Sequence, residues 1–502
     1  MNSFDTDFHR LDPRTVEFLK RAPRHFIGGE WQDAAGGGTI PVINPATAEV
    51  ISAIAAGTAA DIDRAVAAAK AALEAPSWKG LSPDQRERLM HRLADLVEAN
   101  IPLLTEFEVL DNGMTMHFAK NLALAGAVGV LRYMAGWPSK IHGRTVDLGL
   151  PIPGSKFFAA TMREPVGVVG AIVPWNVPFM TTIWKVAPAL AAGCTVVVKP
   201  AEDACLSVLK LAELVAEAGF PPGVVNVVTG TGIAAGEPLV SHPDVAKISF
   251  TGSTVTGKRI GAQASGSLKK VTLELGGKSP NVIFADADLD RAATAASDLI
   301  FLNSGQVCVA GSRLCVERKV LDRVVDAVSM RAASLKVGSG FDPATEIGPL
   351  VSARQQQRVR AYIEDAKAEG ATVLTGGEPV DSAGFFVRPA VVVDTRQDMK
   401  LVQEEVFGPV LAVMPFDDLD QVTGLANDTA YGLAATVWTT NLKTAHEMIS
   451  RLRSGFVAIN SDAIPHPALP QGGFKQSGVG KDLSVEAIEG CLDTKTVLIR
   501  YD

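Results

Sequence analysis

The chain has 502 residues, of which 47% are hydrophobic and 20% are charged. This length predicts about three folding units with large buried cores. Lys and Arg number 47 against 55 Asp and Glu, a net charge of −8, and no basic run is longer than two residues. A nucleic-acid partner is therefore not expected. Ordinary Gly and Pro usage excludes fibrous and low-complexity classes.

Neither a membrane span nor a disulfide framework is expected. The longest uncharged stretch, residues 165–184, contains three prolines, which argues against a membrane helix. Residues 1–21 carry acidic side chains and lack the apolar core of a signal peptide. Five cysteines, an odd number without framework spacing, indicate a reducing compartment. We expect a globular protein of the cytoplasm.

The N-terminal part of the chain is predicted to be an arm followed by helices. Residues 1–24 have mixed charges and no apolar periodicity, which predicts a loosely held arm. Apolar residues at helical spacing predict a helix over 61–73, with Asp61 as its cap, and an amphipathic helical region over 85–110.

Beyond residue 165 the pattern changes to strands that alternate with helices. Short β-branched runs, typical of buried parallel strands, occupy 166–173, 195–198, 224–228, 246–250 and 271–273. A second series places strands at 313–316, 386–393 and 410–413. The alternation predicts doubly wound α/β sheets with a boundary near residue 275. Residues 496–501 alternate like a strand, and the pattern fits pairing within the chain or with another subunit equally well.

Two glycine loops could receive a phosphate at a helix start. Gly230-Thr231-Gly232 and Thr251-Gly252-Ser253 each follow a predicted strand, and their spacing does not choose between them or exclude ordinary turns. Lys199 and Glu202 end another strand, where they could hold the hydroxyls of a ribose or form a salt-linked turn.

Cys308 and Glu274 are the candidates for covalent chemistry. Cys308 lies in a Gly-flanked segment before a predicted strand, unlike the other cysteines, which fall in apolar surroundings typical of structural residues. Glu274 is acidic at the end of a buried strand, where a cap or an ion pair is the commoner role. Metal-ligand spacing of His, Cys or Asp is absent from the sequence.

Seven motifs in order resemble those of the aldehyde dehydrogenase superfamily over residues 26–501. They are Pro174-Trp175-Asn176, Lys199-Pro200-Ala201-Glu202, Phe250-Thr251-Gly252-Ser253-Thr254, Glu274-Leu275-Gly276-Gly277-Lys278, Gly305-Gln306-x-Cys308, Glu404-Glu405-Val406-Phe407-Gly408-Pro409 and Gly472-Gly473-x-Lys475-x-Ser477-Gly478. Within the superfamily the chain is most similar to the phenylacetaldehyde dehydrogenases of bacterial aromatic catabolism.

The resemblance implies an aldehyde dehydrogenase-like α/β fold with two doubly wound domains and a small oligomerisation β-extension. The NAD-binding domain would comprise residues 25–142 and 164–275, and the catalytic domain residues 276–484. Residues 143–163 and 485–502 would form the oligomerisation segments of a homodimer or homotetramer.

The resemblance also implies roles for the catalytic residues. Cys308 would attack the aldehyde to form a thiohemiacetal, and Asn176 with the Cys308 N–H would bind the oxyanion. Glu274 would activate the water, the second substrate, that hydrolyses the thioester, and Lys185 would support proton movement. Lys481 and Asp482 stand where many relatives have Arg-Glu. In the family these two positions are associated with subunit contacts and with a proposed proton route, so the resemblance does not extend to those two features.

For the cofactor, the resemblance favours the Gly252 loop over the Gly230 loop. The residues implied to bind it are Trp175, Lys199, Glu202, Gly252, Ser253, Glu405 and Phe407. The Glu202 carboxylate suits free ribose hydroxyls and repels a 2′-phosphate, which favours NAD over NADP.

The positions that match the family's substrate tunnel carry no charge. They are Gly126, Val177, Met180, Trp184, Leu302, Val307, Val309, Ala463 and Pro465. An apolar, aromatic aldehyde similar to phenylacetaldehyde is therefore expected, and a medium or long aliphatic aldehyde is the alternative. A coenzyme A-acylating dehydrogenase and a catalytically silent relative are second alternatives, and the presence of Glu274, Asn176 and Cys308 argues against them.

Overall fold

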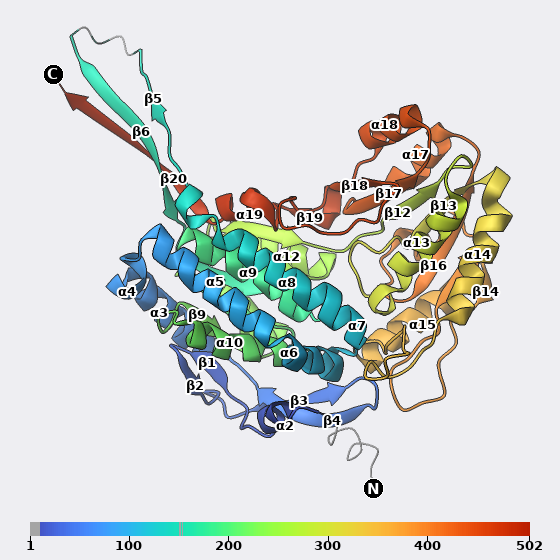
Figure 1. Ribbon diagram of the computed structural model, residues 1–502, viewed down its shortest axis with the longest axis horizontal. Coiled ribbons are helices and arrows are strands. Elements are labelled where there is room, and N and C mark those ends of the chain that lie inside the picture. Colours follow the sequence, from blue (N-terminus) through green and yellow to red (C-terminus); the bar gives the residue numbers. More distant parts are fainter. Residues whose placement is uncertain (1–10, 150–151, 153, 502) are drawn as a thin grey trace.

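The computed structural model describes residues 11–149, 152 and 154–501, arranged around two large sheets and a projecting β-extension (Figure 1). The part of the predicted N-terminal arm that is described packs on the body. Helix α2 (Pro13–Leu19) buries Phe18 and Leu19, and Leu11 is buried just before it. The expectation of a loose arm is wrong for residues 11–19, whereas residues 20–24 are largely exposed, and residues 1–10 lie outside the described residues.

The first sheet has the strand order β19-β11-β10-β7-β8-β9-β1-β2, with a parallel centre from β11 to β9 and antiparallel edges. Its strands are β1 (His25–Ile27), β2 (Glu30–Gln32), β7 (Val168–Ile172), β8 (Thr195–Lys199), β9 (Val225–Val227), β10 (Val245–Thr251), β11 (Lys270–Glu274) and β19 (Gly478–Val479). The strands predicted from the sequence between residues 166 and 273 are thus confirmed.

Helices cover both faces of this sheet. Val169 and Ala171 of β7 pack with α5 (Pro83–Ala99), α8 (Ala125–Ala135), α9 (Pro178–Ala192) and α10 (Leu206–Ala218). Val168 and Ile172 of the same strand pack with α3 (Ala59–Glu74), α11 (Glu237–Ser241) and α12 (Thr254–Ser265). Because alternate side chains point to opposite faces, a strand buried on both sides is apolar throughout.

Two predicted boundaries are corrected. Helix α3 is capped by Thr58, not by Asp61, which instead accepts from the Thr58 N–H as the third residue of a capping box. The helical region expected over 85–110 is broken at Asn100 between α5 and α6 (Ile101–Phe107), where Pro102 fits the first turn of a new helix.

The second sheet has the order β14-β15-β16-β13-β12-β17-β18. Its strands are β12 (Pro280–Ile283), β13 (Arg313–Glu317), β14 (Thr372–Thr375), β15 (Ala390–Val393), β16 (Val410–Phe416), β17 (Ala434–Trp438) and β18 (Phe456–Ile459). Its faces are covered by α13 (Leu289–Phe301) and α14 (Leu321–Ser334), and by α15 (Ala353–Ala368), α17 (Leu419–Asn427) and α18 (Leu442–Arg451). The strand predicted over 386–393 begins only at Ala390.

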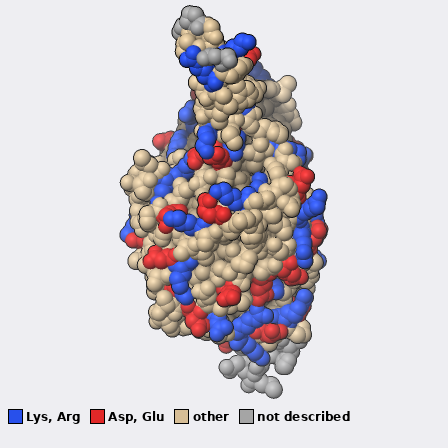
Figure 2. Space-filling view, turned by 90° about the vertical axis from the view of Figure 1, so that its left-hand side faces the viewer, with Lys and Arg blue, Asp and Glu red and all other residues tan. Residues whose placement is uncertain are grey.

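The β-extension projects from the body and consists of β5 (Thr145–Val146), β6 (Lys156–Pro165) and β20 (Leu492–Tyr501) (Figure 1). The C-terminal strand pairs with β6 of its own chain and lies at the edge of this sheet. Figure 2 shows acidic and basic side chains interspersed on the face turned to the viewer. Across the described ranges, no helix is long and apolar enough to span a bilayer.

A π-helical turn, η1 (Glu108–Asn112), continues α6 and carries buried polar side chains. Glu108 accepts hydrogen bonds from the Ser207 hydroxyl and the Phe179 N–H, and Asp111 accepts from the N–H groups of Cys205 and Leu206. Burial raises the pKa of Glu108 to about 8 and that of Asp111 to about 7.

We predict that Glu108 makes folding stability fall as the pH rises from about 5 to about 8. The folded protein retains a proton that the unfolded chain releases near its ordinary pKa of 4.5, so stabilisation is complete below that value and is lost as the pH approaches 8. One such proton changes stability by up to about 1.4 kcal/mol per pH unit. Glu108→Gln should weaken this dependence, as measured by melting temperature against pH.

The matched control is Glu217→Gln, on the exposed face of α10. Its melting profile should follow that of the unmodified protein. A Glu108→Gln protein with an unchanged pH profile would show that Glu108 binds no extra proton on folding.

Candidate active site

A cavity of about 1340 Å³ opens where the parallel strands β7, β8, β10 and β11 of the first sheet end. Ligands of open α/β sheets bind at such carboxyl ends. Of the predicted catalytic, cofactor-binding and tunnel residues, all but Lys185 line this cavity: Cys308, Glu274, Asn176, Trp175, Lys199, Glu202, Gly252, Ser253, Glu405, Phe407 and the nine tunnel positions. Residues separated by more than 300 positions therefore meet in one space.

The loop before Cys308 has an unusual backbone. After α13 the chain takes left-handed conformations at Asn303, Ser304 and Gly305, with φ of 48°, 57° and 74°. The Ser304 hydroxyl donates to the Gly348 carbonyl (2.8 Å). A Cβ on Gly305 would lie 2.1 Å from the Gly408 carbonyl oxygen, so only glycine fits there. Strain of this kind persists where the surrounding structure enforces it, typically at functional sites.

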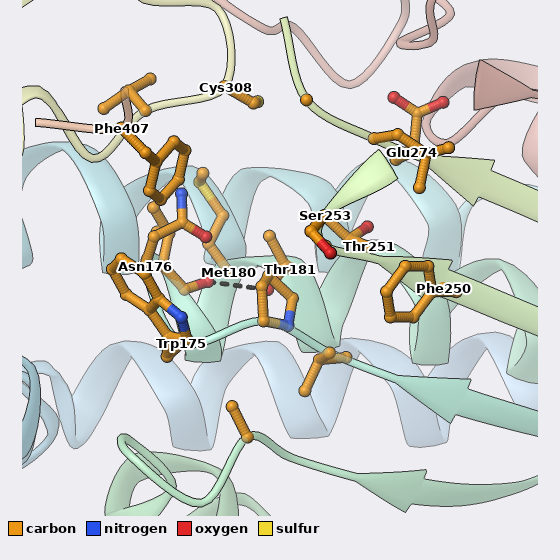
Figure 3. Close-up of a pocket in the computed structure, with 18 of the residues that line it drawn as sticks. Trp175, Asn176, Met180, Thr181, Phe250, Thr251, Ser253, Glu274, Cys308 and Phe407 are labelled. Atoms are coloured by element: carbon orange, nitrogen blue, oxygen red, sulfur yellow. Dashed lines mark hydrogen bonds between the residues drawn. The ribbon is translucent and has the colours of Figure 1, made fainter. Parts of the chain in front are cut away.

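Asn176 lies in the connection from β7 to α9, and two amides join this connection to the Cys308 loop. The Asn176 Nδ2 donates to the Gln306 carbonyl (2.9 Å), and the Asn303 Nδ2 donates to the Asn176 carbonyl (2.9 Å). Each loop thus binds the main chain of the other. The Asn176 amide has a second hydrogen, for which no acceptor is found in the described part of the chain. Asn176 and Cys308 both line the cavity (Figure 3).

Cys308 and Glu274 both hold their protons tightly. Burial raises the pKa of the Cys308 thiol to about 12, and the carboxylates of Glu274 and Glu405 add to the effect. Burial, together with Asp482, raises the pKa of Glu274 well above its ordinary value. Among the described residues, nothing hydrogen-bonds to Oε1 of Glu274. A thiolate at Cys308 therefore requires a base or a nearby positive charge.

Lys185, expected to take part in catalysis, does not line the cavity. It lies on α9, where its Nζ is buried against Asp482 (2.8 Å) and the Ser249 hydroxyl (3.2 Å). Lys185 and Lys481 each lower the pKa of Glu274 and so oppose the effect of Asp482. Lys185 can therefore influence Glu274 through its charge, without contacting a molecule in the cavity.

One part of the cavity has the features of a nucleotide site. Ser253 caps α12 by accepting from the Thr256 N–H, and the first-turn N–H groups of such a helix can bind phosphate oxygens. Lys199 and Glu202 form an ion pair of 3.2 Å at the end of β8. Two exposed apolar residues that the sequence analysis missed, Ile233 and Val255, line the same part.

Glu405 and Phe407 line the same cavity. The Glu405 carboxylate accepts from the Gly277 N–H (3.0 Å), and burial raises its pKa to about 7. The Phe407 ring packs edge-on against Trp175, with centroids 5.2 Å apart (Figure 3). These contacts connect the cofactor candidates to the loop that carries Asn176.

The tunnel positions make a largely apolar wall, to which α9 contributes Met180 and Trp184, and Val177 just before it; Thr181 of α9 lines the cavity beside them. The structure adds polar lining residues that the motifs did not indicate, namely Asn121, Asp298 and Asp462. Burial and the charge of Asp298 raise the pKa of Asp462. The sequence offered no signal for this group, because its members come from separate elements.

Comparisons with known proteins agree with this site. The model of the aldehyde dehydrogenase family matches residues 31–497. Phenylacetaldehyde dehydrogenase of Pseudomonas fluorescens is 43% identical over 489 residues, 97% of each chain. Human mitochondrial aldehyde dehydrogenase is 44% identical over 477 residues, 95% of this chain and 91% of the relative.

Solved structures show the same fold. An NAD⁺ complex of aldehyde dehydrogenase from Bacillus cereus superposes with a TM-score of 0.95 at 46% identity and covers 98% of this chain and 99% of its own. An NAD⁺ complex of betaine aldehyde dehydrogenase from Staphylococcus aureus gives 0.93 at 38% identity and covers 97% of this chain and 96% of its own. The chain therefore belongs to the aldehyde dehydrogenase family and is an NAD-dependent enzyme that oxidises aldehydes.

Proposed function

We propose that this enzyme oxidises an apolar, aromatic aldehyde similar to phenylacetaldehyde to its carboxylic acid through a thioester on Cys308. The observation that carries the proposal is one cavity that is lined by Cys308, by the candidate nucleotide-binding residues and by the apolar tunnel positions. The sheet that contains β10 and β11 is proposed as the NAD-binding domain, and the sheet that contains β12 and β13 as the catalytic domain.

The residues that line the cavity offer partners for each part of NAD. Its pyrophosphate would bind at Ser253, at the N-terminus of α12, and a flat adenine would fit between Ile233 and Val255. Glu202 and Lys199 would hold the adenosine ribose, and Glu405 the nicotinamide ribose. When bound, NAD accepts the hydride that leaves the substrate carbon.

In the first half of the proposed reaction, the Cys308 thiol gives its proton to water, its sulfur bonds to the aldehyde carbon, and the electron pair of the C=O bond moves onto the oxygen. When this oxyanion re-forms the C=O bond, the carbon loses its hydrogen as hydride and a thioester on Cys308 remains. The oxyanion that forms accepts hydrogen bonds from the second N–H of the Asn176 amide and from the Cys308 N–H. Such donors contribute about 3–4 kcal/mol each in other enzymes. The reciprocal amide bonds hold Asn176 in place before substrate arrives.

In the second half, Glu274 removes a proton from water, and the hydroxide attacks the thioester carbon and releases Cys308 and the acid. A carboxylate whose pKa is raised by burial is a stronger base than an exposed one once it is ionised. Gly472 leaves room for this side chain, because a Cβ there would lie 2.6 Å from Glu274 Oε1.

The tunnel favours an apolar substrate. A Cβ on Gly126 would contact only the Met180 sulfur, at 3.4 Å, so this wall has room for a ring. Asp298 and Asp462 add negative charge to the lining, which disfavours aldehydes with an acidic tail. A medium or long aliphatic aldehyde would pack against the same apolar side chains and is the second candidate.

The β-extension is the proposed contact between subunits. Its β20 edge has no strand beside it in the described structure, and Phe158, Met162, Leu498 and Ile499 are about half exposed. Unpaired edges and exposed apolar side chains are features of association surfaces. A homodimer or homotetramer would bury them.

We predict that Glu274→Gln separates the two halves of the reaction. A burst of NADH should remain, because the thioester still forms, but steady-state turnover should fall by about 10²–10⁴-fold without the base. Stopped-flow absorbance measures both phases. Cys308→Ala is the comparison variant and should show neither phase while it still binds NAD. Loss of the burst in Glu274→Gln would place Glu274 before hydride transfer and overturn its proposed role.

We predict that kcat/KM for phenylacetaldehyde exceeds that for acetaldehyde by about 100-fold, because burial of a ring contributes about 2–3 kcal/mol. Gly126→Leu should remove this advantage by filling the tunnel while acetaldehyde still reacts. Gly129→Leu, on the same helix but outside the cavity lining, is the control and should retain it. Equal efficiency with both aldehydes, or preference for succinic semialdehyde, would rule out the aromatic substrate.

A further inference from the structure

The Asn112 side chain is fully buried and binds the loop that carries Asn176. Its Nδ2 donates to the main-chain carbonyls of Trp175 and Asn176, the latter at 3.4 Å. Asn112 does not line the cavity, so it cannot contact a substrate or cofactor there. Its effect on the site must pass through the main chain of the loop.

These bonds provide partners for the carbonyls of Trp175 and Asn176, which lie outside any helix or strand. Trp175 and Asn176 lie between the end of β7 at Ile172 and the start of α9 at Pro178. Buried carbonyls need partners, and here two side-chain amides, those of Asn112 and Asn303, serve the Asn176 carbonyl. The direction of the Asn176 amide depends on the orientation of this peptide.

Asn112 is itself held by a rigid support. Its neighbour Asp111 accepts from two N–H groups at the start of α10, both at 2.8 Å. Glu108, one turn earlier, accepts from the Phe179 N–H at the start of α9. The η1 turn is thereby fixed to both helices, and Asn112 extends from it to the loop between β7 and α9.

We propose that Asn112 is a positioning residue that fixes the Trp175–Asn176 main chain so that the Asn176 amide faces the oxyanion. This inference rests on the proposed oxyanion role of Asn176. Asn112 stabilises the productive orientation of the donor before substrate binds, and its loss lets the loop shift. A displacement of about 1 Å at a catalytic group can cost roughly 100-fold in rate.

A second buried asparagine provides a matched control. Asn226 on β9 is also fully buried and donates its amide to two main-chain carbonyls, those of Val196 (3.3 Å) and Gly223 (2.7 Å). It too lies outside the cavity lining. Asn226 also accepts from the Gly28 N–H (2.9 Å), so its replacement removes at least as many bonds as that of Asn112. A merely structural role therefore predicts no greater loss of rate for the Asn112 variant than for the Asn226 variant.

The test is a double-mutant cycle in which the pre-steady-state rate of NADH formation from propanal is measured at saturating NAD. Propanal is small enough that the result does not depend on the aromatic substrate. Asn112→Ser should slow this step roughly 10- to 100-fold, whereas Asn226→Ser should lower the melting temperature and leave the rate unchanged. In an Asn176→Ala protein, adding Asn112→Ser should have almost no further effect on the rate. NAD affinity, measured by fluorescence titration, should not change.

Several outcomes would overturn the inference. They are an unchanged rate of NADH formation for Asn112→Ser, an equal loss of rate for Asn226→Ser, or an equal effect of Asn112→Ser in the unmodified and the Asn176→Ala proteins. If Asn112→Ser does not fold, Asn112→Gln, which displaces the amide by one methylene, enters the same cycle. A normal rate for Asn176→Ala alone would overturn both the oxyanion role and this inference. A slow Asn176→Ala protein with an additive cycle would overturn the role of Asn112 only.

Discussion

The exchange of amide hydrogen bonds between two loops is the interaction on which the site depends. One loop follows β7 of the first sheet, and the other precedes β13 of the second. Asn176 and Asn303 each donate to the main chain of the opposite loop. Since the proposed nucleophile and the proposed oxyanion donor come from different sheets, these bonds fix their relative position more directly than the distant hydrophobic cores can.

The same junction explains why the loop conformations are strained. Asn303 and Ser304 adopt left-handed conformations that cost of order 1–3 kcal/mol each. Bonds from Asn303 to Asn176 and from Ser304 to Gly348 hold these residues in place. These residues directly precede Cys308, which lines the cavity, so the strained conformation belongs to the loop that carries it.

Local sequence signals predicted the strands and most helices well, because β7 and β8 are apolar throughout and α10 ends at Gly219 in a left-handed conformation. Ordered motifs predicted Cys308, Asn176 and Glu274 as cavity residues. What the sequence could not show depends on distant contacts. Asn112 lies 63 positions from Trp175, and nothing in its local pattern distinguishes it from an asparagine at a helix end. The position of Lys185 behind the cavity likewise follows from its partner Asp482, 297 positions away.

The Lys185–Asp482 pair shows how the fold tolerates a change from the usual family residue. Asp is one methylene shorter than Glu, yet Asp482 reaches Lys185 at 2.8 Å, and both side chains are almost completely buried. The pair is neutral overall, so a protonated Glu274 beside it adds no net buried charge. Ionisation of Glu274 would add a second negative charge beside Asp482 in a buried region, and burial and Asp482 therefore raise its pKa, although Lys185 and Lys481 oppose this effect. The surroundings of Glu274 thus favour its protonated form more than those of an exposed carboxyl would, while the charges of Lys185 and Lys481 act in the opposite direction.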